Sequence, residues 1–136
     1  MKVVKKLLAP VLVVGLLLTS LVTLHNLKDT KKDNVFRIGI SQYITHKSLD
    51  ATRKGFIEEL KKEGYVDGKN IQIDFQNAQG EQRNLKNISK QLAEESDLVF
   101  AIATPSAQSL ANTTKSTPIV FSAVTDPLAA KLVKNL

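Results

Sequence analysis

The sequence predicts a doubly wound α/β fold, in which helices cover both faces of a parallel sheet, preceded by an N-terminal hydrophobic helix. Short apolar runs alternate with longer amphipathic runs from residue 35 onward. The run at 98–103 has no polar position, which is typical of a strand buried on both faces of a parallel sheet. Ahead of these runs, residues 7–24 carry no charge and are mostly Leu and Val.

The N-terminal segment 1–24 reads as a signal-anchor or transmembrane helix. Its eighteen uncharged residues would span about 27 Å as a helix, close to the thickness of the hydrocarbon core. That length favours an anchor over a cleaved signal peptide, although small residues at its far end leave cleavage open. Three lysines precede it, so we expect the following domain at the extracytoplasmic face of the cell membrane, or secreted if the segment is cleaved. Residues 25–34 are polar and read as a tether.

The first half of the domain predicts two strands and a helix. Residues 35–41 form the first strand candidate, and the apolar spacing within 49–63 follows a helical period. Gly64 supplies the helix stop. Residues 71–76 alternate between apolar and polar, as expected of a half-buried or edge strand.

The second half continues the same alternation. Apolar residues three and four positions apart predict a helix over 82–95, and 98–103 follows as the predicted central strand of the doubly wound arrangement. A helix over 105–113, a strand over 119–124 and a last helical stretch over 127–135 complete the predicted order βαβαβαβα.

Composition and motifs exclude several classes of function. The chain has 136 residues and a net charge of +6, but residues 1–34 hold six of the basic residues and only two of the acidic ones. Most of the positive charge therefore lies in the N-terminal segment and does not indicate a nucleic-acid-binding surface. The absence of Cys excludes disulfides and thiolate metal sites, and no carboxylate spacing suggests a metal. Dinucleotide, nucleotide and serine-hydrolase motifs are absent, which predicts no cofactor and no catalytic residue.

Two strand ends share one pattern. Thr104-Pro105-Ser106 follows 98–103, and Thr125-Asp126-Pro127 follows 119–124. Thr104 and Asp126 are good N-cap residues with Pro at the next position, so each should open a helix at the sheet edge where ligands bind. The free amides there favour a carboxylate or phosphate. From the motifs alone, helix capping and nothing more is the favoured reading.

The loop after the first strand offers an adaptable polar set. Gln42 and Tyr43 begin it, and His46 follows, although a lone His is more often a structural residue than a ligand contact. Asp126 could pair with a ligand ammonium while it also caps its helix.

These residues carry a family resemblance. RIGISQYITHKSLDATRKGF, EGYVDGKNIQIDFQNAQGEQ, LVFAIATPSAQSLANTT and TPIVFSAVTDPLAAKLV, in this order, resemble the N-terminal lobe of an ABC-transporter substrate-binding protein of the type that binds tryptophan and other aromatic amino acids. The resemblance covers about 35–136. It implies one lobe of a two-lobed periplasmic-binding-protein fold, with the chain stopping before the second lobe as a truncated fragment would.

The resemblance also implies a role and a site. The role is that of the solute-binding component of an importer, not an enzyme, with an amino acid as ligand and an ABC permease in the membrane as partner. The pocket residues carried over by motif are Gln42, Tyr43, Thr104, Ser106, Ala107, Thr125 and Asp126. The family's usual lipid-anchor Cys is missing, and the N-terminal helix would replace it. A receptor-like sensor lobe and, less favoured, a surface-anchored flavodoxin-like or hydrolase-like enzyme stay open as alternatives.

Overall fold

The computed structural model describes residues 35–135 as a parallel four-stranded sheet with three helices. The elements alternate along the chain: β1 (Phe36–Gln42), α2 (Lys47–Lys62), β2 (Ile71–Asn77), α3 (Gln82–Glu95), β3 (Leu98–Ile102), α4 (Thr104–Thr113) and β4 (Ile119–Ser122). The strand order is β2-β1-β3-β4, so β3 is central and β2 is an edge strand, as predicted. The parallel α/β class is therefore confirmed.

The predicted anchor and tether, residues 1–34, lie outside the described residues. Between residues 35 and 135, no helix has the length and apolar character needed to cross a bilayer.

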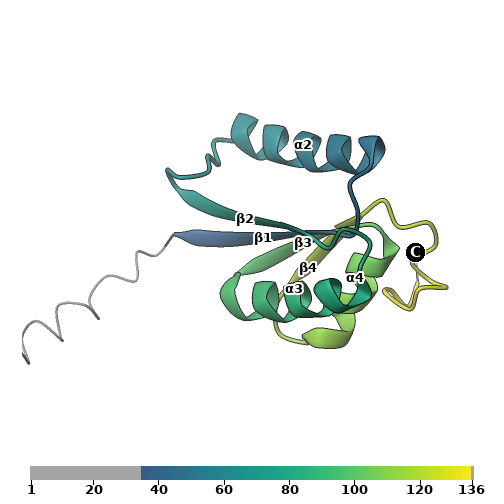
Figure 1. Cartoon of the computed structure of the whole chain (residues 1–136). Helices are drawn as coiled ribbons and strands as arrows, with labels where there is room; N and C mark the ends of the chain where they lie inside the picture. Colours follow the sequence, from purple (N-terminus) through teal and green to yellow (C-terminus); the bar gives the residue numbers. More distant parts are fainter. Residues whose placement is uncertain (1–34, 136) are drawn as a thin grey trace, which may run out of the picture. The chain divides into compact units, whose positions relative to one another are not determined.

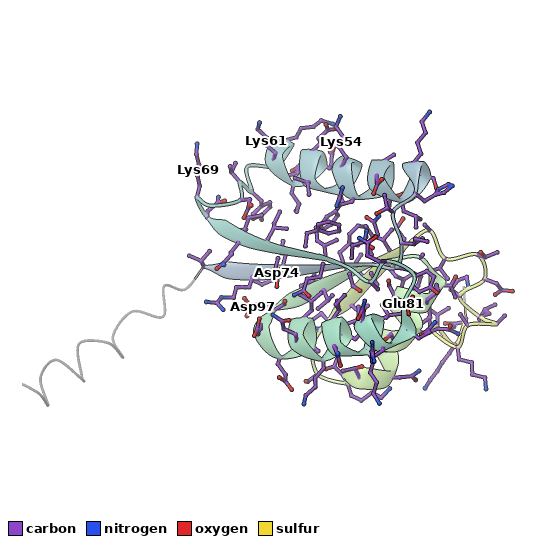
Figure 2. All side chains as sticks on the ribbon, in the orientation of Figure 1. Lys54, Lys61, Lys69, Asp74, Glu81 and Asp97 are labelled. Atoms are coloured by element: carbon purple, nitrogen blue, oxygen red, sulfur yellow. The ribbon has the colours of Figure 1, made fainter. Side chains whose placement is uncertain are left out.

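The helices divide between the two faces of the sheet (Figure 1). α2 lies over one face, where its half-buried side chains Phe56 and Leu60 pack on a buried cluster that includes Ile40 and Phe100. The rings of Phe56 and Phe100 stack with centroids 4.1 Å apart. In Figure 2 the side chains of Lys54 and Lys61 extend from the outer side of α2, away from the sheet. The amphipathic period predicted for this helix therefore separates a core stripe from a solvent face.

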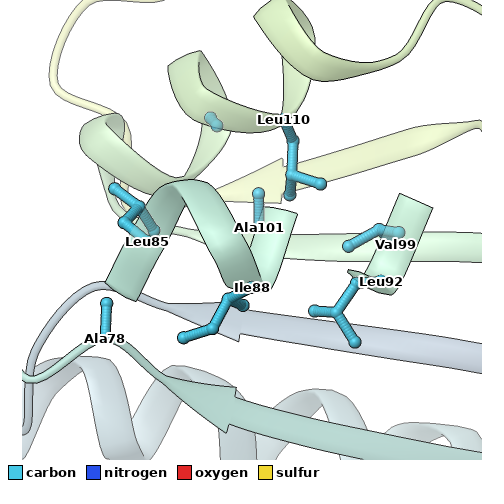
Figure 3. Close-up of a cluster of buried hydrophobic side chains, with 8 residues drawn as sticks. Ala78, Leu85, Ile88, Leu92, Val99, Ala101 and Leu110 are labelled. Carbon is cyan, nitrogen blue, oxygen red and sulfur yellow. The ribbon is translucent and has the colours of Figure 1, made fainter. Parts of the chain in front are cut away.

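The opposite face holds a second core, under α3 and α4 (Figure 3). Leu85, Ile88 and Leu92 of α3 meet Val99 of β3 and Leu110 of α4 in one buried cluster. The three α3 residues are those whose spacing predicted the helix, and its bounds are those predicted. Burial on both faces explains why the 98–103 run has no polar position.

Gly39 allows α3 to lie close against β1. A Cβ atom at this position would come within 2.6 Å of Ser96 Oγ and 3.2 Å of Leu92 Cβ. Real Cβ atoms essentially never come as close as the first of these distances, and the second is tight, so the close approach of helix and strand depends on the missing side chain.

The end of α2 confirms the predicted stop at Gly64. Gly64 has φ +90°, its N–H donates to Lys61 O, and Tyr65 N–H donates to Leu60 O. This pair of hydrogen bonds is a Schellman motif, and the positive φ explains the glycine.

The predicted helix over 127–135 is wrong: the segment forms hydrogen-bonded turns after β4. Lys131 N–H donates to Leu128 O and Leu132 N–H donates to Pro127 O, while Lys131 has φ +57°. These are again the bonds of a Schellman motif, so the chain is turned out of helical geometry after about one turn. Strands β3 and β4 also end earlier than predicted, because Ala103 and Ala123 adopt positive φ.

Candidate functional site: the carboxyl edge of the sheet

The strand order makes the carboxyl ends of β1 and β3 a topological switch point of the sheet. These two strands are neighbours, with Gln42 opposite Ile102 at their ends. The chain leaves β1 toward α2 on one face and leaves β3 toward α4 on the other face (Figure 1). In open α/β sheets, ligands bind at this kind of switch point. The loops that follow β1, β3 and β4 are therefore the candidate site.

Strained backbone collects at this edge. Gln79, Ala103 and Ala123 are non-glycine residues with φ of +55°, +80° and +57°, and they follow the ends of β2, β3 and β4. Ala103 also has ψ of 155°, a combination that is essentially confined to glycine. Its N–H donates to Ser122 O at 3.0 Å and its carbonyl accepts from Ala107 N–H at 3.2 Å, so contacts on both sides hold it in place. Strain of this kind marks functional sites.

Ala103, and not Thr104, is the N-cap of α4. The helix begins at Thr104, and no side chain caps it, so the prediction of a Thr104 cap is wrong. The reason is the turn at Ala103, which brings the chain into helical geometry one residue earlier than the Pro105 pattern suggests. Within residues 35–135, the N–H groups of Thr104 and Ser106 donate to no other residue. They are the donors that the start of α4 offers to a ligand.

Ala107 is not one of these donors. Its N–H makes the first bond of the helix, to Ala103 O, and its side chain is fully buried in the core cluster. Ser106 is also fully buried, and its Oγ has no hydrogen-bond partner in the described part of the chain. An unpartnered buried hydroxyl beside a free amide is a costly arrangement that needs an explanation, and a polar ligand or bound water at the start of α4 would supply one.

A hydrogen bond links the Thr104-Pro105-Ser106 motif to the Thr125-Asp126-Pro127 motif. Thr125 N–H donates to Thr104 Oγ1 at 3.4 Å. Asp126 is exposed, and its Oδ1 accepts from Ala129 N–H at 2.9 Å, so it caps the turn that replaces the predicted helix. One carboxylate oxygen is occupied in this way and the other makes no hydrogen bond within residues 35–135. The structure thus brings Thr104, Thr125 and Asp126 into one neighbourhood.

Gln42 holds the loop that follows β1 in place. It is fully buried, and its Nε2 donates to Ile44 O at 2.9 Å and to Asp50 Oδ1 at 2.8 Å. Its Oε1 has no partner among the described residues. Both amide protons of the side chain are therefore used in holding the loop to the start of α2, and any ligand contact would come from the oxygen.

Tyr43 and His46 also hold the first loop. The Tyr43 hydroxyl donates to Gly80 O at 2.8 Å, and Gly80 N–H donates back to Tyr43 O at 2.8 Å. His46 is the N-cap of α2, where its Nδ1 accepts from Ser48 N–H at 3.3 Å. No hydrogen bond in the described part of the chain joins Gln42 or Tyr43 to the Thr104 and Asp126 group. These two sets of predicted residues share the edge but belong to separate networks.

Sequence reasoning missed two features of the edge. Ala103 gave no signal, because alanine does not ordinarily adopt its φ. Ile44, whose side chain is 42% exposed in the first loop, could have been noticed as an apolar residue between polar ones. Across residues 35–135, no group of three His, Cys, Asp or Glu residues lies close enough to hold a metal ion.

Comparison with known proteins assigns the family. Residues 37–136 match the model of the ABC transporter substrate binding protein family. A tyrosine-binding protein of Clostridioides difficile (strain R20291) is 52% identical over 109 residues, which are 79% of this chain and 31% of that protein.

Solved structures agree in fold. The ligand-free, open structure of a substrate binding protein with adhesive properties from Clostridium difficile has a TM-score of 0.73 at 52% identity, covering 75% of this chain and 35% of that one. An ABC domain in complex with L-Trp from Streptococcus pneumonia has a TM-score of 0.72 at 45% identity, covering 76% of this chain and 35% of that one.

The chain spans about a third of the length of these relatives. The aligned third corresponds to the parallel sheet and the loops at its carboxyl edge. The family model covers 37–136, well over half of the sequence, and the relatives share about half of their aligned residues with it. This chain therefore belongs to the ABC transporter substrate binding protein family.

Proposed function

We propose that the chain supplies one amino-acid-binding lobe of the solute-binding component of an ABC importer, and that its ligand is an aromatic amino acid. Two relatives support the ligand class, since one is a tyrosine-binding protein and another was solved in complex with L-Trp. We propose further that the N-terminal segment 1–24 holds the lobe at the extracytoplasmic face of the membrane, where a permease would be its partner.

The observation that carries the proposal is the start of α4 at the switch point. The free N–H groups of Thr104 and Ser106 lie at the positive end of the helix dipole, which favours a carboxylate. The unbonded oxygen of Asp126 lies in the next loop, linked to Thr104 through Thr125. An α-amino acid carries a carboxylate and an ammonium on one carbon. The carboxylate suits the free N–H groups of α4, and the ammonium suits the unbonded oxygen of Asp126.

The chain alone should bind its ligand weakly. Enclosed pockets bury about 70–90% of a ligand's surface, and an edge on one lobe cannot do this. If a complete two-lobed protein binds at about 1 μM, losing half of that free energy leaves a Kd of roughly millimolar. We therefore expect no calorimetric signal for L-Tyr or L-Trp at micromolar concentrations. A chimaera that joins this chain to the remaining part of the Streptococcus relative should restore binding.

The chimaera also tests the two ends of the site. Asp126→Asn keeps an oxygen for the Ala129 cap but removes the charge, and Thr104→Ala removes the hydroxyl, which accepts from Thr125 N–H and has its own proton to donate to the ligand carboxylate. Each should weaken binding by about ten- to a hundredfold, the typical loss for a hydrogen bond to a charged group. Thr113→Ala, at the other end of α4, is the control and should bind normally. Unchanged affinity in both site variants would reduce Thr104 and Asp126 to structural roles.

A further inference from the structure

The outer edge of β4 has no neighbouring strand in the described sheet. The strand order is β2-β1-β3-β4, so β4 pairs with β3 on one side only. The carbonyls of Pro118 and Ser122 accept hydrogen bonds from the β3 side. Backbone groups alternate in direction along a strand, so the N–H and carbonyl groups of Ile119 and Phe121 point away from β3. Among residues 35–135, no group bonds to them.

The opposite edge of the sheet, at β2, is protected by its own loop. Ile71 O accepts from Gly68 N–H at 3.0 Å, and Ile73 N–H donates to Asp67 Oδ1 at 2.8 Å, so the outward groups at the start of β2 are already bonded. Edge strands are usually blocked by a covering segment of this kind or by charged side chains. β4 has neither protection within the described residues, since positions 116–124 carry no charge.

The side chain of Val120 adds an apolar surface to this open edge. The cluster of buried and half-buried residues under α2 includes residues of β1, β2 and β3 but none of β4. Val120 is therefore 45% exposed, and it lines a groove of about 440 Å³ together with Phe36, Tyr65 and Leu98. Free backbone groups beside an apolar groove are suited to an extended strand with apolar side chains.

A second copy of the chain supplies such a strand. The open edge of the copy is again β4, and two copies of one strand that are related by a two-fold axis across the sheet run antiparallel. With Val120 on the axis, Ile119 of each copy lies opposite Phe121 of the other. The outward N–H and carbonyl groups of both residues then form four hydrogen bonds, and no other register uses all of them.

Charge complementarity favours the same arrangement. Positions 115 and 125 are equally far from 120, so the antiparallel register brings the end of β4 near Lys115 toward the end of the second copy near Asp126. A parallel arrangement would instead bring equal charges together. A contact over four residues of each strand is smaller than the roughly 1,200 Å² of a standard interface, so the association should be weak and reversible.

We propose that two copies of this chain associate through β4, edge to edge, as an antiparallel contact that joins their two sheets into one. The contact closes at two copies because each copy uses its open edge on the other. This inference goes beyond the proposed function and does not depend on the proposed ligand site.

The first test is disulfide trapping with the full-length chain in detergent. The native chain has no cysteine, so a single introduced cysteine reports on one position. Val120→Cys should give a disulfide-linked dimer on a non-reducing gel after mild oxidation, because Cα atoms of such a directly opposed pair lie about 4.5 Å apart. Ser122→Cys, on the same face, controls the register, since its two copies would lie about 14 Å apart. Ile44→Cys, at a residue 42% exposed, controls for random collision.

The second test uses charge at the axis. Val120→Lys or Val120→Glu alone would place two like charges opposite each other and should weaken association about tenfold, as measured by analytical ultracentrifugation. An equal mixture of the two variants should associate again as a heterodimer. Circular dichroism should match that of the native chain, because Val120 is exposed and its backbone pairing with β3 is unchanged. Association through any other surface would not respond to these charges.

Several results would overturn the proposal. One is the absence of a Val120→Cys dimer, and another is a dimer that forms equally well with Ser122→Cys or Ile44→Cys. Charged variants that associate as strongly as the native chain would also contradict it. If oxidation of whole cells joins Val120→Cys to a different polypeptide and gives no dimer, the second copy is the wrong partner for this edge.

Discussion

Gly39 is a single residue on which the packing of an element depends. Gly39→Ala should lower the free energy of unfolding by about 1–3 kcal/mol, because its Cβ would press against the side chains of Ser96 and Leu92. Urea denaturation followed by circular dichroism measures this. Gly55→Ala is the matched control, since nothing lies within 4 Å of a Cβ there and Gly55 is inside α2. That change should raise stability by about 0.5–1 kcal/mol. A Gly39→Ala variant as stable as the native chain, or more stable, would refute the close approach of α3.

Residue-scale features were the least predictable from sequence. Gly64 was read correctly because glycine has a strong intrinsic preference for the geometry that ends a helix. Thr104 was misread because the true cap, Ala103, is held at an unfavourable φ by Ser122 and Ala107, and such contacts leave no mark in local sequence. Asp126 lies between these cases, since its capping role is as predicted although the helix after it is not.

At the scale of elements, α3 and α4 meet through a buried pair of hydroxyl groups. Ser89 Oγ donates to Ser109 Oγ at 2.7 Å, and Ser89 is fully buried. Ser89→Ala leaves Ser109 without its donor and should cost about 1–3 kcal/mol of stability, whereas the double change to alanine should be nearly neutral relative to that single change. Ser109→Ala alone leaves the buried Ser89 hydroxyl without its partner, so a double-mutant cycle in urea should give a coupling of about 1–3 kcal/mol. A coupling of zero would show that the helices pack without this bond.

The elements themselves were largely predictable. Their signal is hydrophobic periodicity, which burial on one stripe or on both faces imposes directly, so α3 and the edge strand β2 appear where expected. The exception is 127–135, whose apolar residues suggested a helix. Periodicity over nine residues cannot reveal that Lys131 takes a left-handed conformation. At the candidate site, the loops and the polar residues could be predicted from the sequence. Which of their polar groups already hydrogen-bond to other groups of the protein could not.

At the scale of the whole molecule, the proposed anchor makes a simple prediction. If residues 1–24 span the membrane, the full-length chain should stay in the membrane fraction after a high-salt wash, because salt releases proteins held by charge but not by a buried helix. Immunoblotting of washed membranes and of the medium measures this. A soluble, shortened chain that begins between residues 20 and 35 would instead indicate a cleaved signal. A variant with Leu16 and Leu17 changed to Lys is the control, and it should leave the membrane.

The strand order also has a kinetic consequence. β1 pairs with β2 and with β3, and the backbone of Arg37 accepts from and donates to Asp97, sixty residues further along the chain. A ribosome adds about 5–20 residues per second, so β1 leaves it several seconds before β3 exists. During that interval one side of β1 has no partner, and the sheet cannot close from its first strand outward. The sheet therefore remains unfolded while the chain is being synthesised. An unfolded chain can pass through a narrow translocation pore, whereas a folded domain cannot.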